Sequence, residues 1–133
     1  MATGTAGTTA RQFTQQATHT MRKRITFDGA LTGNMPNPLP AGAIILRGTV
    51  YVWTAFNDGT ANTINIGISG EADRYMSAGS LASAANVAFD DLANANQYVS
   101  TDQVVTYAIT QTAGDATTGS ADIVIEYLPN NDG

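Results

Sequence analysis

The chain contains no cysteine and only one histidine, and these two shortages exclude much of the usual chemistry of enzymes. Without cysteine there are neither disulfides nor thiolate nucleophiles. One histidine, His19, cannot by itself supply the ligands of a usual zinc site. His19 also lies in a basic segment, far in sequence from an ordered acidic residue that could orient it as a catalytic base. We therefore expect no catalytic residues, no metal site and no cofactor.

Charge is also scarce, because charged residues make up 13% of the chain, about half the usual share of about 25%. Threonine, asparagine, glutamine, serine, alanine and glycine take their place. A surface of hydroxyl and amide groups loses its water at a lower cost than a charged surface does. This composition favours a protein whose surface makes contacts. The hydrophobic share of 43% over 133 residues is sufficient for the core of one domain.

The charges that are present are divided unevenly along the chain. Before Ile25 there are four basic residues and no acidic residue, whereas the remainder holds two basic and all eleven acidic residues. We expect residues 1–24 to form a flexible basic arm and residues 25–133 to form one domain, with a proline-rich connector at 36–40. Because the body is acidic, an acidic protein surface is a better target for the arm than nucleic acid. The alternative is that Arg22, Lys23 and Arg24 protect an edge strand from unwanted pairing.

No apolar run approaches the roughly 18 residues that span a bilayer, so no membrane association is expected. Short alternating segments separated by Gly, Asn, Asp and Pro instead predict an all-β fold. We expect six to eight strands in an antiparallel β-sandwich of jelly-roll type. Residues 49–69 and 103–128 are each expected to form a hairpin, and residues 69–81 a loop with one helical turn. Gly48 is expected to mark a bulge or bend.

The aromatic segment at residues 49–56 has two apolar faces. Val50 and Val52 lie on one face and Tyr51 and Trp53 on the other, which predicts a central strand or one whose outer face is covered. Tyr51 and Trp53 fit either packing between elements or an exposed surface that binds a protein or stacks on sugar rings.

Two pairs of carboxylates, Glu71 with Asp73 and Asp90 with Asp91, have the residue types that glycosidases use. Both pairs lie beside turn residues, where acidic side chains are common for structural reasons, so catalysis is disfavoured. The same acidic loops, and Asp58 with its neighbouring asparagines, offer oxygen ligands for calcium. None has the spacing of a known calcium-binding loop.

The segment VYVWTAFNDGTANTINIGISGEADRYM resembles a pattern of small virion proteins of tailed bacteriophages. It combines an apolar strand, an Asn-Asp-Gly turn, a T-I-x-I-G strand and a G-x-x-D-x-Y segment, over about residues 44–76. The group that it resembles is the capsid cement or decoration proteins, which are small β-sandwiches that join neighbouring capsid subunits. The closing strands VVTYAIT and IVIEYLP are consistent with this group.

The resemblance implies a non-enzymatic protein of the capsid surface, assembled in the host cytoplasm, that binds the major capsid protein and forms a dimer or trimer. An arm that orders on contact can cover a large area of such a partner. The residues expected to contact the capsid are Arg11, Phe13, Arg22, Lys23, Arg24, Tyr51 and Trp53. The alternative function is a carbohydrate- or receptor-binding module of a phage fibre or tail tip, which requires exposed aromatic side chains at Tyr51, Trp53 or Tyr98.

Overall fold

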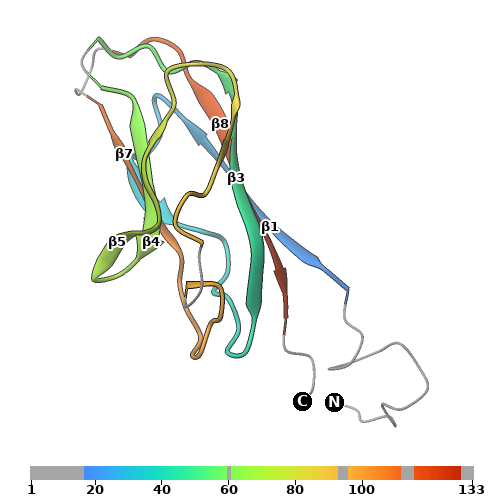
Figure 1. Cartoon of the computed structure of the whole chain (residues 1–133). Coiled ribbons are helices and arrows are strands. Elements are labelled where there is room, and N and C mark those ends of the chain that lie inside the picture. Colours follow the sequence, from blue (N-terminus) through green and yellow to red (C-terminus); the bar gives the residue numbers. More distant parts are fainter. Residues whose placement is uncertain (1–16, 60, 93–95, 112–115, 130–133) are drawn as a thin grey trace, which may run out of the picture.

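The computed structural model describes residues 17–59, 61–92, 96–111 and 116–129. These residues form two antiparallel sheets of four strands each, which confirms the predicted all-β sandwich. Figure 1 shows the two sheets facing each other as separate layers. The first sheet has the order β1 (His19–Thr26), β8 (Ser120–Leu128), β3 (Ile44–Thr54) and β6 (Asn86–Ala88). The second has the order β2 (Thr32–Asn34), β7 (Thr106–Thr110), β4 (Thr63–Ile68) and β5 (Glu71–Ser80).

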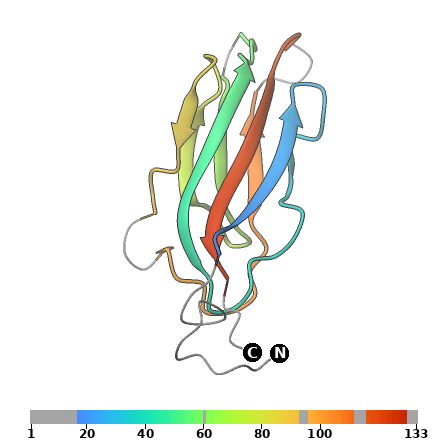
Figure 2. The ribbon, with the colours of Figure 1, turned by 90° about the vertical axis from the view of Figure 1, so that its right-hand side faces the viewer.

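The chain changes sheet at every connection except the one between β4 and β5. This winding of eight strands between two sheets supports the jelly-roll type. The predicted central position of β3 is confirmed, since β3 lies between β8 and β6. Figure 2 shows β3, β8 and β1 side by side in the layer nearest the viewer. No α-helix occurs in the described ranges, and they contain no helix that could cross a membrane.

The core lies between the two sheets and follows the alternation of the strands. Val50 and Val52 of β3, Ile64 and Ile66 of β4 and Ile123 of β8 are all buried, as their spacing predicts. The largest fully buried side chains are Tyr75, Phe56, Leu39, Ile45, Ile64, Ile66, Met76, Leu81, Ile123 and Ile125. Tyr51 and Trp53 are not among them, because they lie on the opposite, outer face of β3.

The two predicted hairpins are wrong. The strands exist, but β3 and β4 lie in different sheets, and so do β7 and β8. Alternation identifies the face of a strand that is buried, and it does not identify the neighbouring strand. The two connections instead cross between the sheets at one end of the sandwich, where the Asn57 Oδ1 atom accepts bonds from the amides of Thr117 (2.7 Å) and Thr118 (3.0 Å).

The prediction of a loop with one helical turn at residues 69–81 is wrong as well, because residues 71–80 form the long edge strand β5. β5 pairs with β4 across a tight turn at Ser69–Gly70, and Gly70 has a positive φ of 87°. Tyr75 and Met76 nevertheless pack into the core as predicted. Irregular pairing at two places along β4 and β5 breaks the alternation that would have indicated a strand.

The predicted bulge at Gly48 is displaced by two residues. The register of β3 against β8 shifts between Ile45 and Arg47, and Gly48 itself pairs regularly with Ile125. A Cβ atom at Gly48 would lie 2.2 Å from the ring of Phe89, so this glycine makes room for an aromatic side chain. The bulge turns Leu46 outward, and its side chain is exposed.

Candidate functional site

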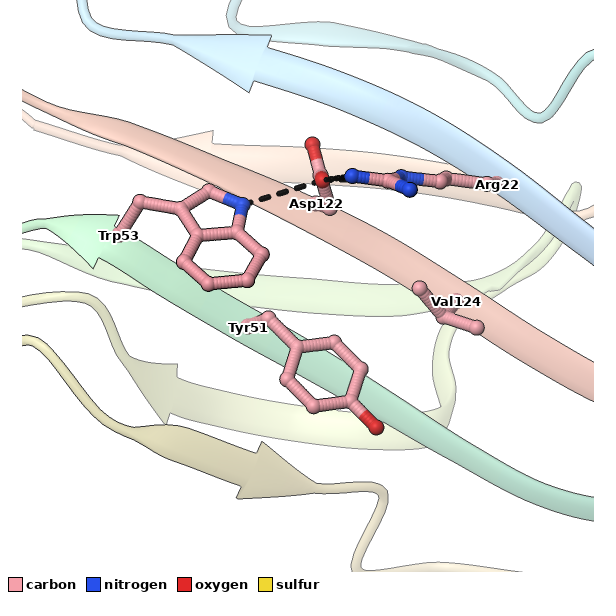
Figure 3. A pocket seen from close by; sticks show the side chains of 5 residues that line it. All are labelled: Arg22, Tyr51, Trp53, Asp122 and Val124. Carbon is pink, nitrogen blue, oxygen red and sulfur yellow. Dashed lines mark hydrogen bonds and ion pairs between the residues drawn. The ribbon is translucent and has the colours of Figure 1, made fainter.

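The outer face of the sheet that contains β1, β8 and β3 brings charged, aromatic and apolar side chains together. The register places Arg24, Asp122 and Tyr51 side by side in one row across the three strands. Arg22 lies opposite Val124 in the next row, and Trp53 follows Tyr51 by two residues on the same face of β3. Arg22, Tyr51, Trp53, Asp122 and Val124 line one open groove of about 250 Å³ (Figure 3).

Asp122 lies at the centre of this face, and its side chain is only 1% exposed. Its carboxylate accepts hydrogen bonds from Trp53 Nε1 at 3.0 Å and from Arg22 Nε at 2.9 Å. Arg22 Nη2 and Arg24 Nε donate closer bonds to the same group, and Arg24 Nη2 lies 3.3 Å from Oδ2. We call Asp122, Arg22, Arg24 and Trp53 the Asp122 cluster. It links the three strands through side chains, in addition to their backbone pairing.

The partners of Asp122 also determine its ionisation. Burial raises the pKa of the Asp122 carboxyl, but hydrogen bonds from Arg24, Trp53 and Arg22 outweigh burial and lower its pKa from 3.8 to about 2. The pKa of Arg24 is raised, chiefly by its hydrogen bond to the same carboxylate. The cluster therefore contains one negative and two positive charges at neutral pH, so this part of the surface is cationic.

Trp53 of the cluster and its neighbour Tyr51 together form an aromatic surface beside the charged side chains. Their ring centroids are 6.2 Å apart and their planes differ by 18°. Figure 3 shows the two rings side by side along β3, with their faces turned toward the viewer. Trp53 is 56% exposed, although its indole N–H is held by Asp122. We call Tyr51 and Trp53 the aromatic platform.

A second candidate surface lies at the other end of β3. His19, Tyr127 and Ile45 form one row across the sheet, so the start of β1 lies close to the start of β3. At that end Ile44 and Leu46 are exposed, and Tyr98, which pairs with Ile44 through an isolated bridge, is exposed too. We call Ile44, Leu46 and Tyr98 the apolar end. Strand β1 begins at this same end, at His19.

Apart from Tyr51 and Trp53 of the aromatic platform, the residues predicted to contact a partner fall into three groups. Arg11 and Phe13 lie outside the described residues. Arg22 and Arg24 belong to β1 and bind the chain's own Asp122, so strand structure begins at His19, within the segment expected to form the arm. Lys23 lies between them on the inner face of β1, opposite the buried Ile123, and it is partly buried.

Side chains of both carboxylate pairs, and the histidine, form hydrogen bonds or ion pairs within the chain. Glu71 forms an ion pair of 2.7 Å with Arg74, and Asp90 accepts a bond of 3.3 Å from the amide of Ser77. The Asn62 side chain bonds twice to the backbone of Asp58, accepting from its N–H at 2.9 Å and donating to its carbonyl oxygen at 2.8 Å, and Asp58 Oδ2 accepts from the amide of Ala61 at 3.0 Å. His19 is exposed and contacts the carbonyl oxygen of Ala17 at 3.0 Å. Within the ranges that the structure describes, no three acidic or histidine side chains gather as metal ligands would.

Asp122, the centre of the candidate site, is not among the residues that the sequence predicts. A signal existed, since Asp122 is an acidic residue next to the apolar run Ile123–Ile125 of a central strand. An acidic residue rarely becomes fully buried unless it is paired, so its position predicts a basic partner on a neighbouring strand. The identity of that partner depends on the β1–β8 register, which alternation alone does not give.

Comparison with known proteins identifies the fold. No protein-family model matches the chain, and no curated protein sequence matches it. A chain of the cyanophage Pam1 capsid asymmetric unit superimposes with a TM-score of 0.63 at 23% identity, over 97% of this chain and 92% of that chain. A chain of the acidic stable capsid structure of Helicobacter pylori bacteriophage KHP30 superimposes with a TM-score of 0.63 at 15% identity, over 85% of this chain and 89% of that chain. At these identities the chain shares the fold of two phage capsid chains.

Proposed function

We propose that this chain is a non-enzymatic structural protein of a phage virion, which binds the capsid shell and stabilises it as a cement or decoration protein. The observation that carries the proposal is the likeness of fold to chains of two phage capsids, in one case over nearly the whole length of both chains. The proposed partner is the major capsid protein, and the proposed location is the capsid surface. A shell offers repeated sites, so we expect a symmetric dimer or trimer around a local axis.

The apolar end and residues 1–16 are the parts of the chain that best suit contact with a shell. Ile44, Leu46 and Tyr98 expose apolar area at one end of the sandwich, and the chain enters β1 at that same end. Exposed ion pairs contribute only about 0–1 kcal/mol each, so useful affinity requires buried apolar contacts of this kind. Arg11 and Phe13 would extend the contact, because 16 residues reach at most about 55 Å when extended.

Arg22, Lys23 and Arg24 would support this contact indirectly. Arg22 and Arg24 hold β1 on Asp122, and β1 is the strand that follows residues 1–16 along the chain. Replacing all three by alanine would therefore disturb the body as well as any interface. The aromatic platform of Tyr51 and Trp53, also expected from the sequence to contact the capsid, has a geometry that fits a different partner.

The test measures retention of purified chain on capsid particles from which the natural chain has been removed, by co-sedimentation. Deletion of residues 2–16 leaves β1 intact and is expected to reduce retention at least tenfold. Leu46→Ser is expected to reduce retention severalfold without unfolding the chain, because Leu46 is an exposed bulge residue. Trp53→Ala is the matched control and should retain full binding. No retention of the natural chain would contradict the proposal and favour a fibre or tail-tip module.

A further inference from the structure

We propose that the aromatic platform and the two arginines of the Asp122 cluster form a binding site for one ring of an acidic sugar. The site lies on the outer face of the sheet, at the opposite end of β3 from the apolar end, so it does not depend on the capsid-binding role.

The platform has the shape that a sugar ring requires. The ring planes of Trp53 and Tyr51 are nearly parallel, with 18° between them, and Figure 3 shows the two rings side by side with their faces turned the same way. A flat aromatic face carries partial negative charge and attracts the weakly positive C–H groups of a pyranose ring. Because Asp122 holds the indole N–H at 3.0 Å, Trp53 is oriented before a ligand arrives, which reduces the entropy lost on binding.

Hydrogen-bond donors lie beside the platform and are not all used by the protein. The carboxylate of Asp122 accepts hydrogen bonds from the Nε and Nη2 groups of Arg22 and Arg24. In the described parts of the chain, no acceptor contacts Nη1 of either arginine. Both side chains are more than half exposed, at 60% for Arg22 and 57% for Arg24. A carboxylate on the ligand can therefore pair with guanidinium groups that Asp122 already holds in place.

The charge at this site has the sign that favours an anionic ligand. Two guanidinium groups surround one carboxylate, so the cluster has a net positive charge within a chain of net charge −5. A neutral sugar would gain stacking but no ion pair. An acidic sugar such as a sialic or uronic acid would gain both.

The size of the site favours a sugar over a protein. The groove of about 250 Å³ is smaller than the roughly 300–1,000 Å³ pockets of drug-sized ligands. A stable protein interface covers about 800 Å² on each partner and has an apolar centre. On this part of the described surface Trp53 is the exposed large apolar side chain, and Leu46 and Ile44 lie roughly 23–30 Å away from it along β3.

The experiment uses Trp53 as its own reporter, because it is the only tryptophan of the chain. The full chain is titrated with 3′-sialyllactose and, as the matched neutral sugar, with lactose, and the intrinsic fluorescence is recorded. We expect a saturable change with sialyllactose and an affinity for lactose at least tenfold lower. No saturable change with sialyllactose or a uronic-acid oligosaccharide would overturn the proposal. Equal affinity for acidic and neutral sugars would overturn the role of the arginines.

Variants separate this site from the capsid contact. Arg22→Gln should lower the affinity for sialyllactose at least fivefold, whereas Arg47→Gln, which changes an arginine of the same sheet paired with Glu126 at 3.1 Å, should not. Trp53→Ala should abolish saturation-transfer NMR signals from the sugar and leave capsid retention unchanged. Leu46→Ser should reduce capsid retention and leave the saturation-transfer signals from the sugar unchanged. Loss of capsid retention in Trp53→Ala would show that the platform contacts protein and would overturn the sugar site.

Discussion

The indole N–H of Trp53 donates to the carboxylate of Asp122 at 3.0 Å, and this bond joins the middle strand β8 to an exposed aromatic ring on β3. The same carboxylate binds Arg22 and Arg24 of β1. One buried acidic side chain thus fastens an edge strand and orients the most exposed aromatic residue of the sheet. The stability of this face and the sugar binding proposed for it would therefore depend on the same group.

Asp122→Asn should destabilise the fold. The amide keeps the shape of the side chain but removes the charge that both guanidinium groups bind, and it presents N–H groups where donors already point. We expect the free energy of unfolding to fall by about 1–2 kcal/mol, near the low end for charged hydrogen bonds because both arginines are largely exposed. Urea unfolding measures the loss. Asp28→Asn, at an exposed position, is the control and should change stability by less than about 0.5 kcal/mol.

The stability of the natural chain should fall in strong acid because of the same group. The pKa of Asp122 is depressed to about 2 in the folded chain, below its ordinary value of 3.8. A depressed pKa means that the carboxylate stabilises the fold above about pH 4, and that this contribution disappears as the pH falls from 4 to 2. Thermal unfolding of the natural chain and of Asp122→Asn, compared from pH 7 to pH 2, should give curves that converge below pH 3. A constant difference down to pH 2 would contradict the assignment.

Gly48→Ala should destabilise the sandwich through crowding. The new Cβ atom would lie 2.2 Å from ring atoms of Phe89, which is nearly buried, so the ring must move. Overpacking of this kind costs about 1–3 kcal/mol. Gly59→Ala is the matched control, because nothing lies within 4 Å of a Cβ atom there. The double variant Gly48→Ala/Phe89→Leu should recover part of the loss if the ring is the cause.

Lys23→Val should promote self-association. β1 is an edge strand, and Lys23 occupies an inner-face position that hydrophobic residues hold on the neighbouring strand. A charge pointing inward from an edge discourages the pairing of that edge with another chain. Sedimentation velocity should show additional large species for Lys23→Val and none for Lys23→Arg, which keeps the charge. Identical profiles for the two variants would assign Lys23 another role.

Sequence and structure agree where burial decides the outcome. The alternation of Ile64 and Ile66 and of Ile123 and Ile125 predicts which face of each strand is buried, because an apolar side chain gains free energy wherever it leaves water. The even spacing of turn residues likewise predicts several short strands. Neither pattern distinguishes a hairpin from a crossing between sheets. The predicted pairing of β3 with β4 and of β7 with β8 is wrong for this reason.

The sequence by itself determined the β-sandwich class, the faces of the strands and the scarcity of cysteine and histidine, since these depend on local alternation and composition. Only the tertiary structure decided which strands are neighbours, and with that which charges meet. Arg22 and Asp122 are separated by 100 residues along the chain and become partners through the register of β1 against β8. That register depends on long-range packing between whole sheets, and it places residues 19–24 of the expected flexible arm in a strand of the folded body.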